Sequence, residues 1–470
     1  MRHLCASAVV VVLILGVLSP SLSVGQSSAP GQATSSAGSS TPQYMGVGSC
    51  SAPQCHGSVR PLTTSKAGVR QNEYTHWVSV EKHARAYEVL LKERSVIMAK
   101  NLKLPEPAEQ SDRCLVCHAM HVPKELQGQK YQREDGVSCE ACHGPAQVWL
   151  ENHVGRDYKD LLKEGMYDTR NLAKRAEKCA SCHIGDETRN VDHELIAAGH
   201  PDLVFELDTF TSILPPHWRV AQDEGGGKAW VVGQAVALRE SLKRLARRTQ
   251  QQAATTWPEF AEFECFACHH EVKNTKSTYY SRGAEKRLQP AGEWPASWRE
   301  VRGYIGVAGL PPWNPARHFV FRQFVQATAP DVRAMLEQEL HNVDSLMAKV
   351  GANNPAQIAA AANRAAQTVD ALLGRIMDQK MEPNLAGTLL RNIAGDSAAI
   401  AGAGFRVAEQ AVMALQTFAP LAQKDGKPLK GDAFMNDAID KLLSAVGKPA
   451  AYNPQQFSTQ MQAIHSFLTR

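Results

Sequence analysis

Cys139-Glu-Ala-Cys142-His143 is the most informative stretch of this 470-residue sequence, because a cysteine pair that ends in Cys-His occurs five times. Two cysteines three positions apart lie on one side of a helical turn. Both thiols can then reach the two vinyl groups of one porphyrin while the next imidazole lies under the iron. This is the attachment signature of c-type haem. The other copies are Cys50-Ser-Ala-Pro-Gln-Cys55-His56, Cys114-Leu-Val-Cys117-His118, Cys179-Ala-Ser-Cys182-His183 and Cys265-Phe-Ala-Cys268-His269.

The motifs predict five covalently attached haem c groups, held by the ten cysteines, with the five motif histidines as axial ligands. The first motif has four residues between its cysteines, and these still span the vinyl groups if the extra residues bulge. Zinc knuckles and thioredoxin-like pairs also use Cys-x-x-Cys. Neither requires a histidine directly after the second cysteine. The total of 11 cysteines leaves only Cys5 outside the motifs, so no thiol remains for a disulfide.

The N-terminus predicts export. Arg2 and His3 precede an apolar run over residues 6–18, and small residues at 21–25 offer a peptidase site, as in a secretory signal peptide. The run is shorter than the roughly 20 residues of a membrane-spanning helix, so a retained anchor is the less favoured alternative. We expect a periplasmic or otherwise exported protein with no transmembrane segment after cleavage.

Composition is that of a large protein with separate cores, since 43% of residues are hydrophobic and 21% charged. The formal net charge of +4 omits the haems, each of which brings two propionates and only about one positive charge at a ferric iron. We therefore expect a holoprotein near neutrality and no nucleic-acid partner. One basic cluster, Lys243-Arg244-Leu245-Ala246-Arg247-Arg248, fits a single helical face and is interpreted as a solvated surface.

The chain divides into five predicted segments. Residues 1–25 form the signal peptide, and the Ser/Gly/Ala/Pro-rich residues 26–43 form a disordered tether. A pentahaem cytochrome c domain follows at 44–289, with a core built largely by the haems. Residues 290–329 form an irregular connection, and 330–470 form an α-helical bundle. The predicted fold class is therefore mainly α.

Apolar residues at three- and four-residue steps support the predicted bundle. Gly351 and Asn354-Pro355 mark a break between its first two helices, and residues 385–418 and 434–446 are further helical segments. The periodic positions of the first two helices are Val332, Leu336, Leu340, Val343, Met347 and Val350, then Ile358, Ala362, Ala365, Val369, Leu372 and Ile376.

The remaining histidines decide the kind of haem site, because a second axial histidine gives a low-spin electron carrier and an open position binds small ligands. They are numerous enough to cap every iron. His121 and His270 lie too close to their own motifs to reach the far side of the same haem. Each either caps a neighbouring haem or is a solvent-facing or propionate-bonded histidine. His341 and His465 lie in the cysteine-free bundle and are interpreted as ordinary surface or core histidines. The eleven histidines are His76, His83, His121, His153, His193, His200, His217, His270, His318, His341 and His465.

Two segments resemble the family of the nitrification tetrahaem cytochrome c-554 and its multihaem relatives. Trp77-Val-Ser-Val-Glu-Lys-His83-Ala-Arg-Ala-Tyr resembles the element after the family's first haem, and the resemblance implies that His83 is a distal ligand. Gly136-Val-Ser-Cys139-Glu-Ala-Cys142-His143-Gly-Pro-Ala, followed by His153, resembles the family's third-haem motif with its distal histidine. The resemblance covers about half the residues.

For the family's remaining distal ligand, beyond the fourth haem, the sequence offers His200 first, then His193 and His217. The resemblance also implies closely spaced haem pairs and a second haem, on His118, that lacks a distal protein ligand. The wider first motif, the fifth haem and the C-terminal bundle depart from the family pattern.

The leading interpretation is an exported pentahaem electron-transfer protein that works between periplasmic redox partner proteins, with no catalytic residues of its own. The alternative is an oxidoreductase acting on a small nitrogen or sulfur compound at an open haem. Such an enzyme needs proton donors beside the iron, and His121 and Lys124 are the nearest in sequence to the second motif. A structural or sensing module would leave most haems without a role.

Overall fold

The protein is described by a computed structural model over residues 41–62, 69–214, 226–250, 257–264, 313–349, 354–447 and 452–470. Helices dominate these residues, which confirms the predicted mainly α class. The fifth motif, with Cys265, Cys268 and His269, lies outside the described residues, as do His217 and the predicted leader. Among the helices that are described, none is both long enough and apolar enough to cross a membrane.

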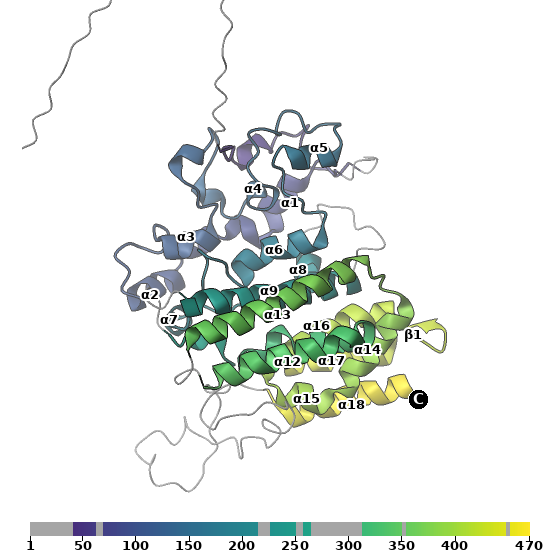
Figure 1. The fold of residues 1–470 in the computed structure, drawn as a ribbon. Coiled ribbons are helices and arrows are strands. Elements are labelled where there is room, and N and C mark those ends of the chain that lie inside the picture. Colours follow the sequence, from purple (N-terminus) through teal and green to yellow (C-terminus); the bar gives the residue numbers. More distant parts are fainter. Residues whose placement is uncertain are drawn as a thin grey trace, which may run out of the picture. The chain divides into compact units, whose positions relative to one another are not determined.

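Short helices make up the part of the chain that carries the first four motifs (Figure 1). The α-helices are α1 (Glu73–Val80), α2 (Glu93–Asn101), α3 (Asp112–His118), α4 (Cys139–His143), α5 (Tyr158–Lys163), α6 (Leu172–His183), α7 (His193–Ala198) and α8 (Leu207–Ile213). The 3-10 helices among them are η1 (Val47–Ser49), η2 (Lys82–Arg85), η3 (Glu88–Leu91), η4 (Lys124–Leu126) and η5 (Arg133–Asp135).

Longer helices follow. They are α9 (Gly227–Gln250), α11 (Phe321–Thr328), α12 (Pro330–Met347), α13 (Pro355–Asp378), α14 (Pro383–Gly395), α15 (Ser397–Gly402), α16 (Phe405–Phe418), α17 (Ala433–Ala445) and α18 (Pro454–Thr469). Three 3-10 turns, η6 (Phe260–Glu262), η9 (Pro315–Arg317) and η10 (Ala419–Leu421), accompany them. Strands β1 (Gln423–Lys424) and β2 (Lys427–Pro428) form an antiparallel hairpin whose turn residues Asp425 and Gly426 both have positive φ.

The first two predicted bundle helices are confirmed as α12 and α13. Asn354 caps α13, because its side chain accepts a hydrogen bond from the Ala356 N–H at 2.9 Å, and Pro355 occupies the first helical position. The predicted segment 385–418 is divided into three helices. Gly404 makes the last break with a φ of 106°, a conformation that costs glycine little.

Helix α9 connects the haem motifs to the C-terminal helices. It packs against α6, which carries the fourth motif, and against α13, and the three lie in successive layers (Figure 1). Most of its side chains are buried, from Trp230 and Val232 near its start to Leu245 near its end.

The interpretation of residues 243–248 as a solvated face is wrong. Arg244 and Arg248 are each only about 5% exposed, and both form ion pairs with Glu262, which is completely buried. Burial would raise the pKa of Glu262, but the two guanidinium groups lower it to about 2. Sequence periodicity places the arginines on one helical face but does not reveal a carboxylate from a distant turn that neutralises them.

Candidate haem-binding site

The described motifs place their histidines at the ends of helices. His118, His143 and His183 are the last residues of α3, α4 and α6, so each imidazole follows a cysteine pair on one helical turn. The wider first motif follows η1 and closes through a hydrogen bond from the His56 N–H to the Cys50 carbonyl at 3.2 Å. A Cβ on Gly57 would lie 1.8 Å from the Ser51 carbonyl oxygen, so this turn requires glycine.

Cysteines of different motifs meet in pairs. The Cys50 thiol lies close enough to that of Cys139 for each to shift the pKa of the other, and the same holds for Cys117 and Cys182. The haem-attaching cysteines of the first motif therefore lie beside those of the third. Those of the second motif lie beside those of the fourth. The remaining described cysteines of these motifs are Cys55, Cys114, Cys142 and Cys179.

Three motif histidines each lie opposite a histidine from a distant segment. The ring centres of His56 and His153 are 6.1 Å apart, with 15° between the ring planes. His183 and His83 are 6.2 Å apart at 74°. The third pair, His118 and His200, is 6.3 Å apart at 83°.

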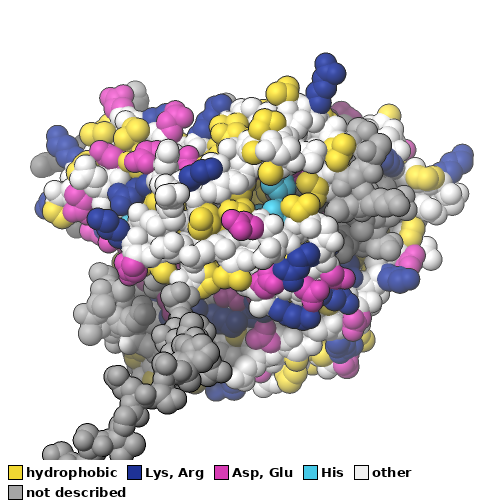
Figure 2. All heavy atoms as spheres, turned by 90° about the horizontal axis from the view of Figure 1, so that it is seen from above, with side chains coloured by type: hydrophobic (Ala, Val, Ile, Leu, Met, Phe, Trp, Pro, Cys, Tyr) yellow, Lys and Arg dark blue, Asp and Glu magenta, His cyan; other side chains and the backbone are white. Residues whose placement is uncertain are grey.

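This spacing matches two imidazoles that bind one metal from opposite sides. A metal–imidazole bond is about 2 Å long and the ring nitrogen lies about 1 Å from the ring centre, so such rings have centres about 6 Å apart. All three pairs agree with this value. On the face seen in Figure 2, histidine side chains lie in a hollow among hydrophobic side chains, as a porphyrin would require. The residues therefore fit axial ligation of haem.

Hydrogen bonds fix which ring nitrogen is available to the metal. The Nδ1 of His118 lies 2.9 Å from the Ala86 carbonyl oxygen, and that of His200 lies 2.7 Å from the Pro201 carbonyl oxygen. His153 contacts the Leu150 carbonyl in the same way. A carbonyl oxygen only accepts hydrogen bonds, so Nδ1 carries the proton and Nε2 keeps a lone pair for a metal.

Two further ligand candidates have carboxylates at the same position. The Nδ1 of His56 lies 2.9 Å from Glu73 Oε2, and the Nδ1 of His83 lies 2.7 Å from Glu81 Oε1. An ionised carboxylate is also an acceptor, so these histidines again present Nε2. Neither glutamate belongs to a recognisable motif in the sequence. Glu81 is only two residues from His83, but Glu73 is 17 residues from His56, and nothing in the sequence marks it.

Burial keeps several of these imidazoles neutral, which is the form that binds a metal. Loss of solvent lowers the pKa of His183 to about 4, with a smaller contribution from His83. Burial also lowers the pKa of His118 and of His200. Phe205 and Phe210 contact the His183 ring, with ring centres 6.0 and 5.1 Å away.

The His83 segment is attached to the third motif by its backbone. The Val137 N–H donates to the His83 carbonyl at 3.1 Å, and the Trp77 indole N–H donates to the Val137 carbonyl at 3.2 Å. Gly136 makes this approach sterically feasible, because a Cβ there would lie 2.6 Å from the His83 carbonyl oxygen. The two segments that carry the family resemblance are therefore in contact.

Glu140, between the cysteines of the third motif, binds three backbone N–H groups on two segments. Its buried carboxylate accepts hydrogen bonds from the N–H groups of Met45 and Gly46, each at 2.8 Å, and of Ala146 at 2.7 Å. Burial raises the pKa of this carboxyl group, while those hydrogen bonds act in the opposite direction. The side chain thereby fixes the chain that leads into the first motif.

The other candidates have different surroundings. His193 begins α7, and its ring lies edge-on to Phe260 at 5.6 Å. His121, a suggested proton donor, forms an ion pair through Nε2 with Asp112 at 2.9 Å, and Lys124 begins η4 with an exposed side chain.

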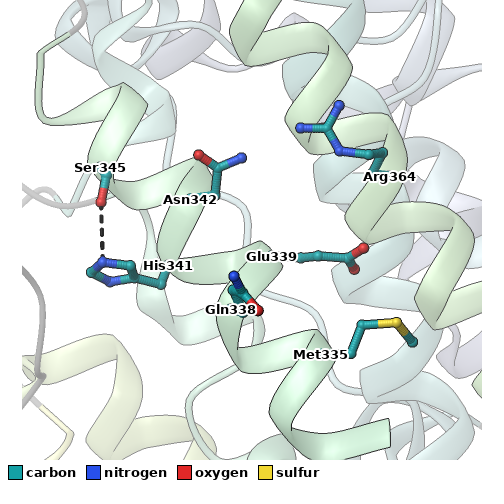
Figure 3. A pocket seen from close by; sticks show the side chains of 7 residues that line it. All are labelled: Met335, Gln338, Glu339, His341, Asn342, Ser345 and Arg364. Atoms are coloured by element: carbon teal, nitrogen blue, oxygen red, sulfur yellow. Dashed lines mark hydrogen bonds between the residues drawn. The ribbon is translucent and has the colours of Figure 1, made fainter.

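A second hollow lies among the C-terminal helices. An open pocket of about 680 Å³ between α12 and α13 is lined by polar side chains, where His341 hydrogen bonds with Ser345 at 3.4 Å (Figure 3). Its other lining residues are Met335, Gln338, Glu339, Asn342 and Arg364.

A protein-family model described as cytochrome c554 and c-prime matches residues 39–144. Over this segment the chain is similar to c-type cytochromes. The match includes the first three motifs and less than a quarter of the chain. Searches of curated proteins and of solved structures found no match. The similarity supports covalently bound haem c and electron transfer with redox partners, while the fourth and fifth motifs and the C-terminal helices lie outside the matched residues.

Proposed function

We propose that this protein is an exported pentahaem c-type cytochrome that transfers electrons between periplasmic redox partner proteins. The observation that carries the proposal is the set of three histidine pairs at 6.1–6.3 Å. Paired axial histidines suit a low-spin site that exchanges electrons and leaves no position for a substrate. When bound, haem supplies an iron that changes between the ferric and ferrous states.

In this proposal each described motif has a defined task. The cysteines attach the haems, and the motif histidines bind from one side. His153, His200 and His83 bind from the other side at the first, second and fourth sites. The contacts of Cys50 with Cys139 and of Cys117 with Cys182 support short distances between neighbouring sites. We extend the count to five because Cys265, Cys268 and His269 repeat the motif.

The placement of His200 favours the carrier over the alternative oxidoreductase. The family resemblance implies an open second haem, but His200 lies opposite His118 at the same separation as in the other two pairs. A site closed by two histidines has to lose a ligand before it binds nitric oxide or hydroxylamine. His121 also interacts with Asp112 and is thus already engaged.

Electron paramagnetic resonance (EPR) of the oxidised holoprotein tests the proposal. Nearly parallel ligand planes, as in the His56–His153 pair, give a rhombic low-spin signal, whereas the nearly perpendicular planes of the other two pairs give strongly anisotropic signals. We expect both types and no high-spin signal from the second site. The His200→Ala variant should gain a high-spin signal and bind nitric oxide when reduced, and the control His341→Ala should not. A high-spin second site in the wild type would favour the oxidoreductase.

A further inference from the structure

The histidines proposed as axial ligands differ in the group that forms a hydrogen bond with Nδ1. At the second site both partners are neutral backbone carbonyls, those of Ala86 and Pro201. At the first and fourth sites one histidine has a carboxylate partner instead, Glu73 for His56 and Glu81 for His83.

Glu73 is held firmly against His56. It is the first residue of α1, and its second carboxylate oxygen accepts a hydrogen bond from the Arg70 N–H. The next residue, Tyr74, donates its N–H to the His56 carbonyl at 2.9 Å. The Glu73 side chain is only 15% exposed, so water competes weakly for its contact with the imidazole.

Glu81 is more deeply buried, with 7% of its side chain exposed. It directly follows the last residue of α1 and caps that helix, because its N–H donates to the Trp77 carbonyl at 3.1 Å. Its carboxylate reaches forward to His83. Residues 81–86 thus serve two sites, since His83 belongs to the fourth and the Ala86 carbonyl orients His118 of the second. One short segment gives a charged partner to one site and a neutral partner to its neighbour.

The charge of the partner affects the iron through the imidazole. A carboxylate that accepts the Nδ1–H makes the ring a stronger electron donor and adds a negative charge nearby. Both effects stabilise the ferric state relative to the ferrous state, and hydrogen bonding around the ligands is an established determinant of haem potential. A neutral carbonyl has a weaker effect of the same kind.

We propose that Glu73 and Glu81 are positioning residues that hold His56 and His83 and lower the midpoint potentials of the first and fourth haems below that of the second. The inference rests on the proposed function, because it requires haem at all three sites. Electrons that reach the motif region then reside preferentially at the second site, where both ligands meet only carbonyl groups.

The test compares Glu73→Gln and Glu81→Gln with the wild type in redox titrations followed by EPR. Glutamine keeps the size and an acceptor oxygen but removes the charge. We expect Glu73→Gln to shift only the first-site signal to a more positive potential, and Glu81→Gln only a fourth-site signal. The His153→Ala and His200→Ala variants assign the first- and second-site signals. Glu88→Gln is the control, since Glu88 is exposed and pairs with Lys92 at the surface.

Unchanged potentials in both variants, with full haem content and low-spin spectra, would overturn the inference. If either variant fails to incorporate haem, the wild-type titration decides. During reduction of the wild type, the ferric EPR signal of the first site should then persist to a lower potential than that of the second site. The reverse order would overturn the inference. A wild type without low-spin signals would instead contradict the proposed function, so the two failures are distinguishable.

Discussion

The motif-bearing segment before α6 and the helices from α9 to α18 are both helical, but different interactions hold them together. Before α6, buried apolar side chains form two small clusters, one around Leu115 and one around Trp149. From α6 onward the described residues form a single cluster that extends through α9 to α18. Small clusters rarely stabilise so many residues. The comparison indicates that the first region depends on its cofactors, whereas the second is stabilised by its own side chains.

The largest expected effect comes from a change in the first region. Cys142→Ser removes one thioether at the third site, and we expect the mean haem content to fall by about one per chain. Proteases should then cleave the first region faster, while the helical circular dichroism of α9–α18 should persist. Intact-mass spectrometry and limited proteolysis measure both effects. The adjacent Ala141→Ser is the matched control, and equal haem content in the two variants would contradict this dependence.

The second prediction concerns Glu262, which forms ion pairs with two buried arginines of α9 in the second region. Glu262→Gln leaves Arg244 and Arg248 buried without a counter-charge, which should cost about 3–5 kcal/mol of unfolding free energy. Urea denaturation followed by circular dichroism measures the cost, and the exposed Glu337→Gln should be nearly neutral.

The lowered pKa of Glu262 also predicts that the stability of the protein depends on pH in the acid range. Its pKa of about 2 in the folded protein lies below the ordinary value of 4.5, so folding favours the ionised carboxylate. That contribution is complete above about pH 4.5 and is lost as the pH falls toward 2. Between pH 5 and 3 the wild type should lose stability more steeply than Glu262→Gln. If the unfolding free energies of the two proteins fell in parallel with pH, Glu262 would not be the group responsible.

The third prediction tests the side-chain core of the second region with two methionines on one helix. Met347 is completely buried and Met335 is half exposed, at the pocket of Figure 3. Met347→Ala should lower the free energy of unfolding by about 3 kcal/mol, because it leaves a cavity. Met335→Ala should cost much less. Neither variant should change the EPR spectrum, and an altered spectrum in Met347→Ala would show that the two regions are not separable in this way.

The smallest effect is expected at an ion-pair bridge that joins α6, α9 and α13. Arg239 on α9 contacts Glu177 of α6 at 2.6 Å and Asp370 of α13 at 2.8 Å. The carboxylates of Glu177 and Asp370 are more than a third exposed, and Glu240, which Arg239 also contacts at 2.8 Å, keeps Lys243 as a second partner. Arg239→Met should therefore cost only about 1 kcal/mol. Differential scanning calorimetry should show a broader transition, because α6 is then less tightly coupled to α9 and α13. Lys441→Met is the control, since Lys441 is exposed and pairs with Asp437 at the surface. Identical thermograms for wild type and Arg239→Met would exclude the bridge as a coupling element.

The sequence was most informative where the chemistry is local. Cysteines and histidine within five residues predict haem attachment, and three- and four-residue periodicity predicts α12 and α13, including the break at Asn354-Pro355. The periodicity did not predict the breaks within 385–418, because Gly395 and Gly404 are compatible with either a continuous or an interrupted pattern.

Partner choice across the chain was not predictable in the same way. His118 and His200 face each other although they lie far apart in sequence. In the same way, the Arg244 guanidinium donates a hydrogen bond to the distant Ile184 carbonyl, just after the fourth motif. Several histidines were equivalent candidates by residue type, so composition could not rank them. Only the path of the backbone around α3, α4 and α6 brings particular pairs to the separation that a metal requires.

The sequence by itself determined that this chain carries haem-attachment motifs followed by a helical region without cysteines, because both are encoded by spacings of a few residues. The tertiary structure decided which histidines face each other, which carboxylates meet their Nδ1 atoms and which arginines are buried. Most of those features depend on contacts between residues distant along the chain, which form only when the helices pack against one another, as α9 does against α6 and α13.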